Sequence, residues 1–120
     1  MYQSNLMHDK TIDFIDFAKI DIRLGTIIEA VEYDELRVPS ILLKIDFGKK
    51  IGIKKSSAQI RKYYSPSKLI NKQVIAVTNF KPKQIGKIIS EVLVLGLPDE
   101  NNEPILISPP FELKNGIKLY

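Results

Sequence analysis

The side chains best suited to chemistry lie in one short stretch, residues 79–90. The Asn79 amide can donate and accept hydrogen bonds, and the ring of Phe80 can stack on a base or pack against an apolar peptide side chain. Ser90 adds a hydroxyl where the next strand is predicted to begin. Three lysines between them supply positive charge without sequence discrimination, namely Lys81, Lys83 and Lys87. This chemistry suits a surface that binds phosphates, bases or polypeptide.

Groups for catalysis are few. His8 is the only histidine and there is no cysteine, so a cysteine nucleophile, a thiolate metal site and a disulfide are excluded. Neither common glycine-rich phosphate loop is present. Asp46 and Glu91 could form a carboxylate pair, but Asp46 falls on the polar face of a predicted strand, which favours a structural role. The sequence therefore predicts a protein that is not an enzyme and holds no cofactor or metal.

Positive charge is concentrated in the middle of the chain. The protein has 18 basic and 14 acidic residues, a net charge of +4. Residues 44–87 contain twelve basic residues and one acid, a net charge of +11, whereas both ends are acidic. This asymmetry favours a surface that faces a polyanion over an ordinary solvated lysine surface. The side chains of adjacent residues on a strand point to opposite faces, so only one of Lys54 and Lys55 can line the binding surface. We expect it to be Lys54.

The elements that position these residues are short strands. A glycine-bent strand over 20–28 and a hairpin of 41–47 with 50–56 are predicted from alternating apolar residues. Later apolar strands are predicted over 73–78, 91–97 and 105–107. A helical segment is predicted over 13–18, and a second short helix from Ser56 or Ser57 through Tyr63, ended by Pro66. Five or six strands with few helices predict an all-β fold, a five-stranded Greek-key barrel of OB type.

The length suits one domain with one core. We expect an N-terminal tail over residues 1–11 and the OB-type domain over residues 12–120. No apolar run is long enough to span a bilayer, so no membrane insertion is expected. The first residues lack the features of a secretory signal, and a cytoplasmic location is therefore predicted.

Several segments, in the same order along the chain, resemble the tRNA-binding-domain superfamily. This superfamily includes free-standing tRNA-binding proteins and the C-terminal extension of methionyl-tRNA synthetases. They span residues 17–25, 45–48, 53–60, 69–77 and 79–96. The resemblance covers about residues 12–120 and implies a tRNA-binding-type OB fold with a C-terminal extension. One departure is Asn71, where a glycine is usual; asparagine tolerates positive φ, so we expect the turn to survive.

The run Ser-Glu-Val-Leu-Val-Leu-Gly at residues 90–96 resembles the CsaA branch of this superfamily. Synthetase-type domains read Ser-x-Gly-Met at this point, and the added bulk of Val92 and charge of Glu91 argue against specific tRNA binding. The CsaA resemblance implies a homodimer with export-related chaperone activity toward unfolded or pre-secretory polypeptides, without ATP. It also suggests that Phe14 and Phe17 help form the dimer interface, although packing on their own barrel is the simpler alternative.

Two functions are thus open. The first is a dimeric chaperone for unfolded or pre-export polypeptides, and the second is a module that binds tRNA or another structured RNA through its basic surface. One OB face can serve either kind of extended ligand. The predicted RNA- or peptide-binding residues are Lys54, Asn79, Phe80, Lys81, Lys83, Lys87 and Ser90.

Overall fold

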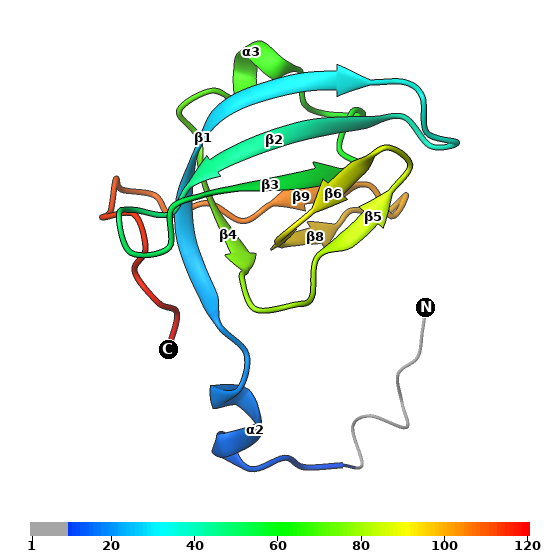
Figure 1. Ribbon diagram of the computed structural model, residues 1–120. Coiled ribbons are helices and arrows are strands. Elements are labelled where there is room, and N and C mark those ends of the chain that lie inside the picture. Colours follow the sequence, from blue (N-terminus) through cyan, green and yellow to red (C-terminus); the bar gives the residue numbers. More distant parts are fainter. Residues whose placement is uncertain (1–9) are drawn as a thin grey trace.

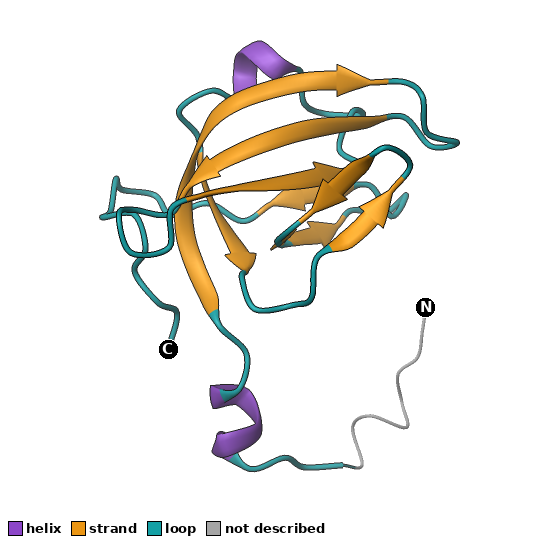
Figure 2. Ribbon diagram, viewed as in Figure 1, coloured by secondary structure: helices purple, strands orange, loops and turns teal. Residues whose placement is uncertain are grey.

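A curled five-stranded antiparallel sheet forms the body of the protein (Figures 1 and 2). The computed structural model describes residues 10–120, so His8 and the predicted tail up to residue 9 lie outside the described residues. The sheet contains β1 (Ile22–Tyr33), β2 (Ser40–Asp46), β3 (Ile53–Ala58), β4 (Gln73–Val77) and β7 (Leu93–Val94) in the order β3-β2-β1-β4-β7. The prediction of an all-β, OB-type fold is confirmed.

Smaller elements decorate this sheet. One hairpin joins β5 (Lys83–Ile85) to β6 (Ile88–Ser90), and another joins β8 (Gly96–Pro98) to β9 (Pro104–Leu106). The helices are α2 (Phe14–Ala18) and α3 (Pro66–Leu69). Within the described residues, no helix has the length and apolar character needed to cross a membrane.

The core lies inside the curl of the sheet. Ile41, Leu43 and Ile45 alternate along β2 and are at most 1% exposed, while Lys44 between them is exposed. Ile27 of β1 and Val74 of β4 are fully buried against the same cluster. This period of two is what places one face of each strand in the core.

β1 changes its neighbour close to Gly25, since it pairs with β4 over residues 22–26 and with β2 from residue 26 onward. The register with β2 shifts between Ile27 and Glu29, so a bulge lies just after this point. Gly25 itself is a site of close packing. A Cβ there would lie 2.6 Å from Cγ2 of Ile45 and 2.7 Å from Cδ1 of Phe47. Only a residue without a side chain lets these two core residues reach the strand.

The second predicted helix is misplaced. Residues 56–58 continue β3, where Ser56 pairs with Leu43 across the sheet. The helix is α3, and Pro66 begins it rather than ending the preceding segment. Proline fits the first helical turn because its missing N–H would have no helical partner there.

Other boundaries also differ from the prediction. The turn between β2 and β3 is longer than a tight two-residue turn, since Gly52 N–H donates to the carbonyl of Gly48. The predicted strand over 91–97 is divided between β7 and β8. Residues 83–90, for which no strand was predicted, form the β5–β6 hairpin. Asn71 has a φ of 71°, so the expectation that asparagine supports this turn is confirmed.

The C-terminal extension lies along the start of β1. Leu24 N–H donates to the carbonyl of Ile117, and Leu119 N–H donates to the carbonyl of Ile22. The Gln73 side chain fixes the extension further, bonding both the N–H and the carbonyl of Leu113. The C-terminus is thereby held close to the segment that leads from α2 into β1 (Figure 1).

We expect Gly25→Ala to lower the free energy of unfolding by about 1–3 kcal/mol, because the added methyl would overpack the core against Ile45 and Phe47. Val31→Thr, at an exposed position of the same strand, should change it by less than about 0.5 kcal/mol. Urea denaturation of the two variants checks this. Equal stability of Gly25→Ala and the wild type would contradict the close packing at Gly25.

Candidate binding groove

Two open hollows meet beside the β5–β6 hairpin. The first, the basic hollow, has a volume of about 530 Å³ and the second, the seam hollow, about 1000 Å³. They share Ser57, Ile85 and Leu93 and so form one continuous feature, called the groove below. The basic hollow is also lined by Phe80, Lys81, Lys83, Ser90, Glu91 and Val92. The seam hollow lies between the end of β3 and the β7–β9 segment.

The pairing of β5 with β6 turns one face of this hairpin toward the groove. Lys83 lies opposite Ser90, and Ile85 lies opposite Ile88. Since directly opposed residues share a face, the groove-lining side chains Lys83, Ile85 and Ser90 come together there. Gly86, with a φ of 62°, permits the tight turn that joins the two strands.

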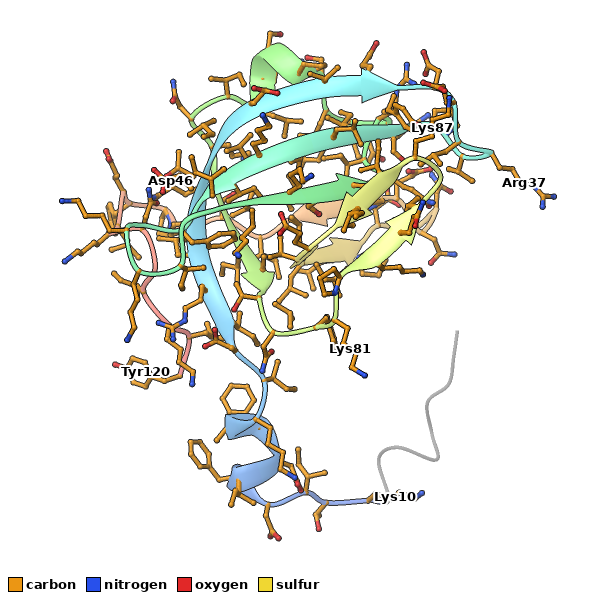
Figure 3. The ribbon with its side chains drawn as sticks, in the orientation of Figure 1. Lys10, Arg37, Asp46, Lys81, Lys87 and Tyr120 are labelled. Carbon is orange, nitrogen blue, oxygen red and sulfur yellow. The ribbon has the colours of Figure 1, made fainter. Side chains whose placement is uncertain are left out.

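Four of the seven predicted binding residues line the basic hollow: Phe80, Lys81, Lys83 and Ser90. Lys87 does not, because it lies at the far end of the hairpin from Lys81 (Figure 3) and pairs with Glu35 at 3.9 Å. Asn79 and Lys54 line neither hollow. The sequence therefore identified one wall of the groove, and the fold separates the other three residues from it.

Lys54 lies on the inner side of the sheet. It is opposite Ile45, which is fully buried, so its side chain starts on the core-facing side at the end of the barrel. Lys55 starts on the outer face, opposite Lys44. The two lysines thus point apart, as expected for strand neighbours, but Lys54 does not join Lys81 and Lys83.

Ser90 and Glu91 close the barrel onto β3. The Ser57 N–H donates to the Ser90 hydroxyl at 3.1 Å. The Glu91 carboxylate accepts the Lys55 N–H at 3.0 Å, and the Glu91 N–H donates to the Lys55 carbonyl at 2.8 Å. Asp46 binds its own turn by accepting the Gly48 N–H at 2.8 Å. The two carboxylates therefore have separate structural roles and form no catalytic pair.

The Asn79 amide ties the end of β4 to the start of the barrel. Its oxygen accepts the Asp21 N–H at 3.0 Å, and its nitrogen donates to the Lys19 carbonyl at 2.7 Å. Both halves of the amide are engaged in this way. A ligand that used Asn79 would have to displace these main-chain partners.

Asp21 is the most strongly bonded carboxylate at this junction. Its partial burial opposes ionisation, but hydrogen bonds from Thr78 and Arg23 and the charges of Arg23 and Lys118 outweigh burial and lower the pKa of Asp21. The ionised form is therefore favoured by the fold. Asp21 and Asn79 together hold α2 and β1 in place.

The positive charge of residues 44–87 is partly neutralised in the fold. Acids of β1 and of the β1–β2 connection lie next to it. Lys44 pairs with Glu29 at 3.7 Å, and Arg61 pairs with both Glu32 and Asp34. Such exposed pairs add little stability, but they reduce the net charge that a polyanion would meet.

Tyr63 lies in the β3–α3 connection, next to Lys62 of the seam hollow. Its hydroxyl donates to the Asp99 carboxylate, which raises the pKa of Tyr63 and lowers that of Asp99. Asp99 also accepts the N–H groups of Asn101 and Glu103 in the β8–β9 turn. This contact joins the connection after β3 to the β8–β9 hairpin.

The groove residues that sequence reasoning missed include the three that line both hollows: Ser57, Ile85 and Leu93. The alternation of Lys83 with Ile85 could have indicated that both face the same side, had the hairpin been recognised. Nothing local marks Ser57 or Leu93, because their place in the groove depends on how the barrel closes.

A small OB-type barrel with an open lateral groove defines a binding module. The sequence model of the protein family described as "Putative tRNA binding domain" matches residues 22–118. The chain belongs to this tRNA-binding-domain family and is of the CsaA type.

Solved structures and curated sequences agree on this relationship. The CsaA chaperones of Bacillus anthracis and Picrophilus torridus are each 47% identical, with a TM-score of 0.85, over 92% of this chain and 100% of theirs. The methionine–tRNA ligase of Pyrococcus horikoshii is 37% identical over 111 residues, 90% of this chain. The chain spans only 14% of that ligase's length, so this similarity does not assign the ligase activity to the chain.

Acidification should test the junction at Asp21. Because its pKa is lowered on folding, its contribution to stability is present above about pH 4 and is lost as the pH falls through the lowered value. We expect Asp21→Asn to be less stable than the wild type at pH 7, with a smaller difference at pH 3. Thr78→Val removes the hydroxyl that donates to both the carbonyl and the carboxylate of Asp21, and its stability at pH 7 should lie between those of the wild type and Asp21→Asn. A pH-independent difference in urea denaturation would contradict this role.

Proposed function

We propose that the protein is a dimeric, export-related chaperone that binds unfolded or pre-secretory polypeptides in the groove without ATP. The observation that carries this proposal is the accessible apolar lining. Phe80 is 58% exposed and Leu93 is 50% exposed, and Ile85 lies between the two hollows. Apolar surface of this kind gains free energy by covering extended chains that expose similar side chains. The similarity to CsaA chaperones supports it.

Capture of this kind breaks no bond, so we propose that the protein is not an enzyme and uses no cofactor. The described residues contain no group of three histidine, cysteine, aspartate or glutamate side chains placed to hold a metal. We further propose that residues 12–120 are the functional domain and that it acts in the cytoplasm.

The dimer interface is proposed to form around α2. None of the α2 residues is buried, and Phe14, at 74% exposed, lies beside Phe17 with ring centres 6.0 Å apart. In Figure 1 the helix projects away from the barrel. Ile117 and Leu119, both partly exposed, lie along the start of β1 that follows it. A twofold dimer would cover this apolar surface, because the same patch serves both subunits.

Binding of tRNA or another structured RNA is the second candidate. The family match favours it, as do Lys81 and Lys83 on the wall of the basic hollow. Phosphate binding through these lysines would be strongly salt-dependent. The pairing of Lys44, Arg61 and Lys87 with acids counts against an extended phosphate-binding face.

Salt and lysine substitutions should separate the two functions. We expect a labelled unfolded preprotein segment to keep its affinity within about threefold between low and high salt, because apolar burial is not screened. Replacing Lys81 and Lys83 together with Ala should abolish any RNA binding and leave peptide binding largely intact. The matched control replaces Lys49 and Lys50, on the remote β2–β3 turn, and should affect neither. Fluorescence anisotropy with tRNA and peptide measures this. Salt-sensitive binding of tRNA alone would overturn the chaperone proposal.

Replacing Phe17 or Phe14 with Asp should give monomers, because a charge in the apolar contact is costly to bury. Ile89→Asp, at an exposed apolar position on the β5–β6 hairpin, is the control and should leave the mass unchanged. Light scattering of the purified variants gives the result. If both Phe variants keep the mass of a dimer, α2 is not part of the interface.

A further inference from the structure

The last part of β3 has a free main-chain edge. Lys55 turns both its N–H and its carbonyl away from β2, since both bind Glu91. Main-chain groups alternate along a strand, so Ser57 and Gln59 point to the same side. The Ser57 N–H reaches only the Ser90 hydroxyl. Within the part of the chain that the structure describes, the Ser57 carbonyl and the Gln59 N–H have no hydrogen-bond partner.

This free edge runs along the groove. Ser57 lines both hollows, and Ala58 and Gln59 line the seam hollow. Across the groove lie the apolar side chains of Ile85 and Leu93. An unpaired strand edge next to apolar surface is a template on which another extended chain can form hydrogen bonds.

We infer that the groove takes its client by strand addition to β3. An extended segment pairs its main chain with the Ser57 carbonyl and the Gln59 N–H and turns alternate apolar side chains toward Ile85 and Leu93. This inference rests on the proposed function, since the client site is the same groove. Main-chain pairing does not depend on sequence, so one edge can accept many unfolded segments.

Charge narrows the chemistry of this client. In the seam hollow, Asp34 and Glu103 are balanced by Arg61 and Lys62. In the basic hollow, Lys81 and Lys83 form no ion pair within the described residues. The favoured occupant is therefore an extended polypeptide with alternating apolar residues, and an acidic side chain at the end over Lys81 and Lys83 adds only the small attraction of an exposed ion pair.

The test uses the labelled peptide Glu-Val-Thr-Val-Thr-Val-Thr and two N-methylated forms of it, with the full-length protein. One form is methylated at the three valine amides and the other at the three threonine amides. These two sets point to opposite edges of the extended peptide, whereas the valine side chains all face one way. With the direction of the peptide fixed by its terminal Glu over Lys81 and Lys83, only one set can therefore meet β3 while the valines face the groove.

Fluorescence anisotropy should show that the unmodified peptide binds, that one methylated form binds about tenfold more weakly, and that the other stays within about twofold. Equal affinities of the two methylated forms would overturn strand addition, whether both bind or neither does. If the unmodified peptide and an unfolded preprotein segment both fail to bind, the proposed function itself is wrong, and this outcome is distinct from the first.

A protein variant tests the same contact from the other side. Gln59→Pro removes the free N–H without breaking a hydrogen bond, and proline favours the extended conformation that Ala58 already has in β3. We expect about a tenfold loss of affinity for the unmodified peptide. The control Gln59→Ala keeps the N–H and should bind within about twofold. Thermal unfolding checks that both variants are folded. Equal affinities of the two folded variants would contradict pairing at Gln59.

Discussion

The hydrogen bonds between Lys55 and Glu91 join the two ends of the curled sheet, and the rest of the structure depends on them. Lys55 lies on the first strand in spatial order, and Glu91 lies two residues before the last strand, β7. This closure buries Val92 in the core. It also fixes the β5–β6 hairpin, which ends at Ser90, over the side of the barrel. Without it the apolar interior would open, and the groove would lose a wall.

The closure is only partial, and this is what makes a groove possible. On the edge of β3 that faces away from β2, the residues after Lys55 meet a serine hydroxyl instead of a strand. Beyond that hydroxyl, this edge has no main-chain partner among the described residues. An OB barrel that paired fully at this point would have no free edge and no seam hollow. The accessible apolar side chains Phe80 and Leu93 lie at the same opening. In the proposed function, stability and client binding therefore compete for the same backbone groups.

Charge has a different part in the molecule from the one that its distribution along the chain suggests. The basic residues of 44–87 and the acids before them occupy separate parts of the sequence, but the fold brings them close together. Antiparallel pairing of β1 with β2 brings Glu29 opposite Lys44, and the next turns bring Arg61 to Glu32. Lys81 and Lys83, which form no ion pair within the described residues, form a small basic rim on an apolar site. This balance suits a polypeptide client better than a long phosphate backbone.

The sequence by itself determined the fold class and the family. Alternation of apolar residues is enough to give strands, since it is a property of neighbouring residues, and the motif at residues 79–96 is continuous in the chain. It also placed Phe80, Lys81, Lys83 and Ser90 in one site, because they lie within twelve residues of each other. The helix after β3 was misplaced, since pairing with β2 decided how far β3 extends. Only the tertiary structure decided that Asn79 ties two segments together and that Lys54 and Lys87 lie apart from the groove. It alone added Ser57, Ile85 and Leu93, because a groove between strands depends on contacts between residues far apart in the chain, which no local pattern records.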